Sequence, residues 1–123
     1  MGNCRTVWAP NRGCPVLEGD VFEGAVFSVV DKATGDPFPL DGFSIKTQYR
    51  EKTKTGNLLL TQEIGSGLSW VDQSNGIFQI DPFLIDFPVG VVFSDIEFKD
   101  PALPAPYTWV TAKWSVEQSV TQP

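Results

Sequence analysis

The chain has 123 residues, enough for one domain with its own hydrophobic core, and its 41% of hydrophobic residues exclude disorder over the whole length. Nine basic residues stand against fifteen acidic ones, a net charge of −6, so we expect no nucleic acid as a partner, since binding a polyphosphate requires a basic surface. No apolar run reaches the roughly 18 residues of a membrane span, so we expect no membrane partner, and ten prolines with eleven glycines favour short strands over long helices.

Residues 1–17 are predicted to form an irregular N-terminal arm, because two prolines and a glycine interrupt this stretch. The arm contains both cysteines of the chain, Cys4 and Cys14. A disulfide between them would close the arm and contribute about 2–3 kcal/mol. In a reducing cytoplasm the two thiols would stay free, and the sequence leaves both states open.

The arm is too apolar for an idle tail. We expect it to bind a neighbouring protein through Val7, Trp8, Val16 and Leu17, because a tryptophan on an arm can fill a pocket of a partner and dominate the binding energy. The alternative is that the arm folds back on its own domain and covers the second apolar face of the segment 21–30.

Seven segments have the alternation, length and flanking turn residues of short β-strands. The clearest is 43–50, where Ile45, Thr47 and Tyr49 are predicted to point inward. A hairpin is predicted at Asn75-Gly76, the strongest short turn signal in the chain. The predicted strands are 21–30, 43–50, 58–64, 68–71, 77–80, 91–98 and 107–116.

Three local details are also predicted. In the strand 21–30, alternation places Phe22, Val26 and Val30 on one face. In the last strand it places Trp109 on the face opposite to Val110. A helix of one or two turns is expected at residues 81–88, because Asp81 can cap it and a proline follows at its first position.

Seven short strands without a long helix predict an all-β fold, an antiparallel β-sandwich, with a small β-barrel as the structural alternative. The domain is expected to cover residues 18–118, followed by a C-terminal tail at 119–123.

Candidate catalytic groups are few. Histidine is absent, which removes the commonest general base and metal ligand. Asp95 and Glu97 alternate onto one face of a strand, and Asp81 and Asp86 flank the expected helix, but no sequence feature builds a cleft around either pair. The loop 31–36 offers two carboxylates, too few for a calcium site. We therefore expect no catalytic residue, no metal and no cofactor.

The chain has four tryptophans, which could stack on sugar rings as they do in carbohydrate-binding modules. Packing and protein interfaces are equally suited to tryptophan, and we favour these roles. The four are Trp8, Trp70, Trp109 and Trp114.

Six short motifs follow one another along most of the chain. They are 18–22 (EGDVF), 35–43 (GDPFPLDGF), 46–50 (KTQYR), 75–78 (NGIF), 93–98 (FSDIEF) and 114–121 (WSVEQSVT). In order and spacing they resemble the N-terminal domain of phage baseplate upper proteins and the small phage proteins related to it. The chain departs from that pattern at Pro39, where the family has Asp, in the proline-rich connection 100–106, and in the arm, which has no counterpart.

The resemblance implies an immunoglobulin-like sandwich and a structural place in a virion. It implies a non-enzymatic structural protein of a tailed bacteriophage, in the tail, baseplate, neck or capsid surface, made in the cytoplasm of the bacterial host. The partners would be other virion proteins and copies of the chain itself in a symmetric assembly. The alternative is a module that binds carbohydrate or a host receptor.

Overall fold

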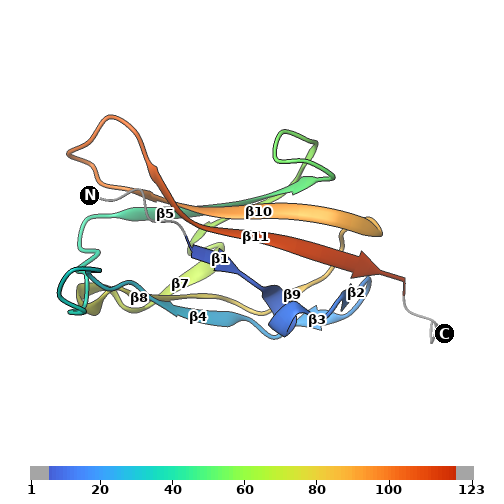
Figure 1. Ribbon diagram of the computed structural model, residues 1–123, viewed down its shortest axis with the longest axis horizontal. Helices are drawn as coiled ribbons and strands as arrows, with labels where there is room; N and C mark the ends of the chain where they lie inside the picture. The colour runs from blue at the N-terminus through green and yellow to red at the C-terminus, as the bar shows by residue number, and fades with distance from the viewer. Residues whose placement is uncertain (1–5, 119–123) are drawn as a thin grey trace.

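The computed structural model describes residues 6–118 and shows an all-β protein, as predicted (Figure 1). These residues form eleven strands and two 3₁₀ turns. The strands are β1 (Thr6–Trp8), β2 (Val16–Leu17), β3 (Val21–Phe22), β4 (Ala25–Ser28), β5 (Ser44–Glu51), β6 (Leu58–Ile64), β7 (Gly67–Asp72), β8 (Ile77–Ile80), β9 (Phe83–Leu84), β10 (Gly90–Lys99) and β11 (Tyr107–Glu117). The turns are η1 (Pro10–Gly13) and η2 (Gln73–Asn75).

Most strands belong to one curled sheet, in the order β1-β11-β10-β5-β6-β7-β8-β4, and β2 also pairs with β11. The sheet folds over on itself, so that β5, β10 and β11 lie in one layer and β4 and β8 in the other (Figure 1). A second, two-stranded sheet of β3 and β9 completes the second layer. The sheet is mixed, because β1 and β2 run parallel to β11 and β6 runs parallel to β7. The result is a β-sandwich that is open along one side.

The three long strands of the first layer have the predicted alternation. In β5, Ile45, Thr47 and Tyr49 are buried, and the residues between them are half-buried on the outer face. The same period of two buries alternate residues of β10 from Val92 and of β11 from Val110. These strands pair antiparallel with each other, β5 with β10 and β10 with β11.

The prediction for strand 21–30 was wrong, because Gly24 divides it into β3 and β4. Gly24 has φ +93°, a conformation that side-chain-bearing residues rarely adopt, and a Cβ there would lie 2.6 Å from the carbonyl oxygen of Ile80. The irregular backbone at Gly24 changes the phase of the alternation. Phe22 and Phe27 therefore both face the core, whereas Val26 is 63% exposed.

The helix expected at 81–88 does not form, and the segment is extended. The Ile85 N–H donates to the Asp20 carbonyl, 2.7 Å away, and the Ile85 carbonyl accepts from the Gly19 N–H at 2.9 Å. Phe83 is half-buried, and Ile85 and Phe87 are buried. This alternation has the period of a strand, and burying three apolar side chains outweighs the local capping signal.

The arm expected to be irregular forms part of the domain over its described residues, 6–17. Thr6–Trp8 and Val16–Leu17 pair in parallel with β11, so no domain boundary falls at residue 17. Val16 is only 7% exposed and belongs to the core, and Trp8 packs edge-on against Phe22 and Phe27. This is the fold-back arrangement, in which the arm covers apolar side chains of β3 and β4.

Trp109 does not point away from the core as predicted. A β-bulge in β11 leaves it without a Cα partner on β10, since Ile96 pairs with Val110 and Glu97 with Thr108. The bulge turns Trp109 to the same side as Val110. Its ring lies 4.8 Å from the ring of Phe98.

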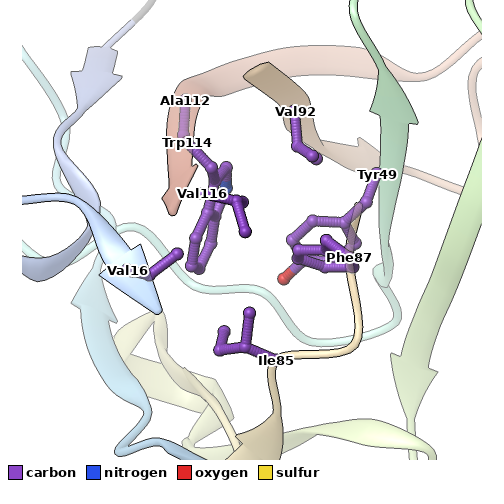
Figure 2. Packing of buried hydrophobic residues seen from close by; sticks show 8 residues of the cluster. All are labelled: Val16, Tyr49, Ile85, Phe87, Val92, Ala112, Trp114 and Val116. Carbon is purple, nitrogen blue, oxygen red and sulfur yellow. The ribbon is translucent and has the colours of Figure 1, made fainter. Parts of the chain in front are cut away.

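The interior consists of two adjoining clusters of buried residues, which share half-buried aromatic side chains. Figure 2 shows the first cluster, in which Trp114 and Tyr49 face each other with ring centroids 5.6 Å apart. The residues labelled there are Val16, Tyr49, Ile85, Phe87, Val92, Ala112, Trp114 and Val116. Trp8, Phe22 and Phe83 touch both clusters and so connect them.

We expect Ile45→Ala and Ile96→Ala each to lower the free energy of unfolding by about 2–5 kcal/mol, because each removes buried volume and leaves a cavity. Both side chains are 2% exposed. Lys46→Ala, on the outer face of β5, should cost less than about 1 kcal/mol. Urea denaturation measures all three, and equal losses at Ile45 and Lys46 would contradict the register of β5.

We expect Trp8→Ala to cost about 3 kcal/mol of stability, because the ring packs against aromatic rings from both layers. Val7→Ala is the matched control from the same strand, and it should cost less than about 0.5 kcal/mol, since Val7 is 79% exposed. Urea denaturation again gives the comparison. If the two changes cost the same, Trp8 does not hold the arm to the domain.

Candidate interaction surfaces

The first carboxylate pair considered in the sequence, Asp95 and Glu97, lies among charged residues of neighbouring strands. Asp95 and Glu97 both lie on the outer face of β10, and Glu97 is the Cα partner of Lys46, which is in turn the partner of Glu63 on β6. Alternating charges across three strands stabilise the sheet, as opposite-charge cross-strand pairs do. Among residues 6–118, no group of three His, Cys, Asp or Glu side chains is placed to hold a metal ion.

Asp81 accepts hydrogen bonds instead of capping a helix. Its carboxylate accepts from the Ser69 Oγ at 2.8 and 2.9 Å and from the Gln79 Nε2 at 2.9 Å. These contacts join β7 and β8 to the residue that follows β8. Asp86, the other member of the predicted pair, is exposed two residues after Leu84. The two carboxylates therefore have separate environments.

The loop 31–36 is held by its own first residue. The Asp31 Oδ1 accepts hydrogen bonds from the backbone N–H groups of Ala33 at 2.8 Å and Thr34 at 3.3 Å. The Asp36 N–H donates to the Thr34 Oγ1 at 3.2 Å. An aspartate that bonds to backbone groups two and three residues ahead is typical of a turn, so Asp31 has a structural role in this loop.

The possible disulfide involves Cys4, which lies outside the described residues. Cys14 is exposed directly after η1, and the structure gives it a free thiol. The possible pairing of Cys4 with Cys14 thus stays a prediction.

The tryptophan side chains pack against other residues of the domain. Trp114 is 1% exposed, and its Nε1–H donates to the Ser94 Oγ at 2.9 Å. Trp109 contacts Phe98 and also Tyr107, whose ring lies nearly parallel to it at 7° and 5.2 Å. Trp70 packs half-buried against the second core cluster.

A buried polar pair lies between β5 and β6. The Tyr49 hydroxyl donates to the Gln62 Oε1 at 2.8 Å, and the two side chains are 0% and 3% exposed. Burial raises the pKa of the Tyr49 phenol, because the charged phenolate would lose its hydration. The pair satisfies two polar groups inside the core, a structural role.

Of the four arm residues predicted to bind a partner, two are used by the domain itself. Val16 is buried and Trp8 fills the space between the layers, while Leu17 is half-buried in β2. Val7 alone of the four is well exposed, and a partner contact there stays a prediction.

Val7 lies at a shallow groove of about 330 Å³ on the outer face of the first layer. Phe93, an aromatic residue of β10, also lines this groove, and its Cα partners are Arg50 on β5 and Lys113 on β11. We call this surface the basic groove. Its larger apolar residues are Val7 and Phe93, and its basic residues are Arg50, Lys54 and Lys113. Sequence alternation predicts that Arg50 and Lys113 lie on the outer faces of their strands. It does not predict that Val7 lies beside them.

The second layer has an apolar pair on its outer face. Val21 and Leu84 are Cα partners in the sheet of β3 and β9, and they are 62% and 58% exposed. Exposed acidic residues flank the pair: Asp20, Glu23 and Asp86. These five residues form a surface that we call the acidic patch.

The charges are divided unequally between the two layers. Residues 18–41 and 72–86, which supply β3, β4, β8 and β9 with their connections, contain nine acidic residues and only one basic residue, Lys32. Residues 44–64 and 90–117, which supply β5, β6, β10 and β11, contain six of each sign. The second layer therefore carries most of the net negative charge.

Comparison with models of known protein families and with curated protein sequences finds no match for this chain. The described residues contain no helix long and apolar enough to cross a bilayer. The evidence for a function thus comes from the surfaces of the sandwich and from the sequence motifs.

We expect the stability of the protein to fall above about pH 10 because of Tyr49. A phenol whose pKa is raised on folding binds its proton more tightly in the native state than in the unfolded chain. Its contribution to the free energy of unfolding is therefore constant below the ordinary pKa of 10.0 and is lost as the pH rises above that value. Each further pH unit should cost up to about 1.4 kcal/mol.

Urea denaturation at rising pH tests this, with Tyr49→Phe as the comparison protein. Tyr107 is present in both proteins, so its contribution cancels. The variant should lose less stability than the parent above about pH 10. Identical alkaline losses would show that Tyr49 is not the group responsible.

Proposed function

We propose that this chain is a non-enzymatic structural protein of a tailed-bacteriophage virion, in the tail, baseplate, neck or capsid surface, and that it binds neighbouring virion proteins. The observation that carries the proposal is the pair of opposite outer faces, each with exposed apolar surface beside charged side chains: Val7 on one face, and Val21 with Leu84 on the other. Protein interfaces commonly have an apolar centre and a polar rim. A protein with such surfaces on both layers can contact neighbours on two sides.

The sequence motifs support the same function. Residues 18–22 lead into β3, and residues 75–78 contain the turn into β8, where Gly76 has φ +72°. Residues 46–50 and 93–98 lie on the neighbouring strands β5 and β10. These four motifs thus lie on strands of both layers or on the turn that leads into one.

A module that binds carbohydrate or a host receptor is the second candidate. One observation favours it: Tyr107 is half-buried at the end of an aromatic stack and its ring is nearly parallel to that of Trp109. Aromatic faces of this kind bind sugar rings in other modules. The stack also fits simple packing, because Trp109 contacts the buried Phe98.

Purified phage particles test the proposal. Mass spectrometry should find the chain in particles from a host that carries its gene, at a fixed ratio to the other virion proteins, and a map of the intact particle should accommodate the domain at symmetric positions. Disrupting the gene should stop assembly or remove one component. A chain absent from purified particles would contradict a structural role.

A glycan array separates the second candidate from the first. The structural protein should bind no glycan, and Tyr107→Ala should leave its incorporation into particles unchanged. Glycan binding that Tyr107→Ala abolishes would favour the sugar-binding module instead.

A further inference from the structure

The basic groove and the acidic patch are complementary in charge. Arg50, Lys54 and Lys113 line the groove together with a single acidic residue, Asp95. Lys54 and Lys113 are exposed, whereas Arg50 donates a hydrogen bond from its Nη1 to the Gly56 carbonyl at 3.1 Å and is thereby held in place. The groove therefore has three basic residues and one acidic residue in a protein whose net charge is −6, and two of the basic residues, Arg50 and Lys113, are the cross-strand neighbours of Phe93.

The acidic patch has the opposite arrangement. Asp20, Glu23 and Asp86 surround the exposed side chains of Val21 and Leu84. Arg12 lines one groove together with Asp20, Val21 and Glu23, and one basic residue against the three acidic residues of the patch leaves an excess of negative charge. Both surfaces thus combine apolar side chains with charged ones, and the signs of the charges are opposite.

We propose that the acidic patch of one copy docks on the basic groove of the next. This inference rests on the proposed function and names one of its contacts. Charge complementarity argues for a second copy as the occupant, because the same chain supplies both surfaces, and complementary potentials steer association. An isologous contact of the groove with itself would instead place Arg50, Lys54 and Lys113 against the same cations of a partner.

The two surfaces lie on opposite layers of the sandwich (Figure 1). A contact between different surfaces of identical subunits is heterologous, so each added copy presents a fresh groove and a fresh patch. Such a contact closes into a ring if the rotation between copies allows it and extends into a filament if it does not. Salt should weaken the association, since exposed charges are screened over about 8 Å at physiological ionic strength.

Reciprocal charge reversal tests the proposal with the purified protein. Lys54→Glu with Lys113→Glu reverses the rim of the groove, and Glu23→Lys with Asp86→Lys reverses the rim of the patch. All four residues are exposed, so the fold should be kept. Each double variant alone should associate at least about tenfold more weakly than the parent protein in sedimentation equilibrium. An equimolar mixture of the two should recover association, because each retains the surface that the other has lost.

Asp36→Lys is the matched control, since it reverses an exposed charge on the loop 31–36, away from both surfaces. It should associate as the parent does. A parent protein that stays monomeric up to millimolar concentration, or association that salt does not weaken, would overturn the proposal without needing any variant. Failure of the mixture to associate would do so as well.

The experiment also distinguishes this contact from the proposed function. A chain found in virions whose purified form never self-associates would keep the structural role and lose this contact. Self-association through the two surfaces in a chain absent from virions would keep this contact and contradict the structural role.

Discussion

The arrangement of the sandwich depends on the aromatic contacts around Trp8. Its ring contacts Phe22 and Phe27 of the second layer, with centroids 5.9 and 5.1 Å away, and Trp114 of the first layer at 5.6 Å, all nearly edge-on. Edge-to-face contacts of this kind add about 0.5–1.5 kcal/mol to the burial of the rings. Trp8 thus fills the open side of the sandwich, where the end strands β1 and β4 are not hydrogen-bonded to each other. Through edge-to-face, tilted and stacked ring contacts together, thirteen of the fifteen aromatic residues form one connected network, which Trp70 and Phe93 do not join.

Phe93 lies outside this network because the alternation of β10 places it on the outer face of the sheet. Inward positions on β10 are taken by residues such as Val92 and Ile96, and Phe93 lies between the inward pair Val92 and Ser94. The strand therefore places an aromatic ring on its outer face, where cross-strand neighbours supply cations. The same strand alternation that fills the core also produces the surface on which the functional proposals depend.

Sequence reasoning was reliable where the determining pattern is local. The alternation of β5, β10 and β11 was readable because a half-buried strand repeats every two residues. It failed where the determining contact is distant in sequence. Nothing near Trp8 indicates a parallel partner at Ala112, and nothing near Trp109 indicates a bulge opposite Ile96. At 81–88 the local capping signal was present, but pairing with Asp20 and core burial decided the structure. The acidic patch could not be predicted either, because Val21 and Leu84 become neighbours only through the pairing of β3 with β9.

The parallel pairing of the first described strand with the last has a consequence for synthesis on the ribosome. Thr6 pairs with Val110, and Val16 pairs with Val116, so both strands of the N-terminal segment must wait for β11 before they can form hydrogen bonds. Trp114, whose ring contacts Trp8 and Tyr49, is likewise among the last of the described residues to be translated. Contacts between residues so far apart in sequence slow folding. The core therefore closes only after nearly all of these residues have been translated, and until then the apolar N-terminal segment is exposed to whatever binds nascent chains.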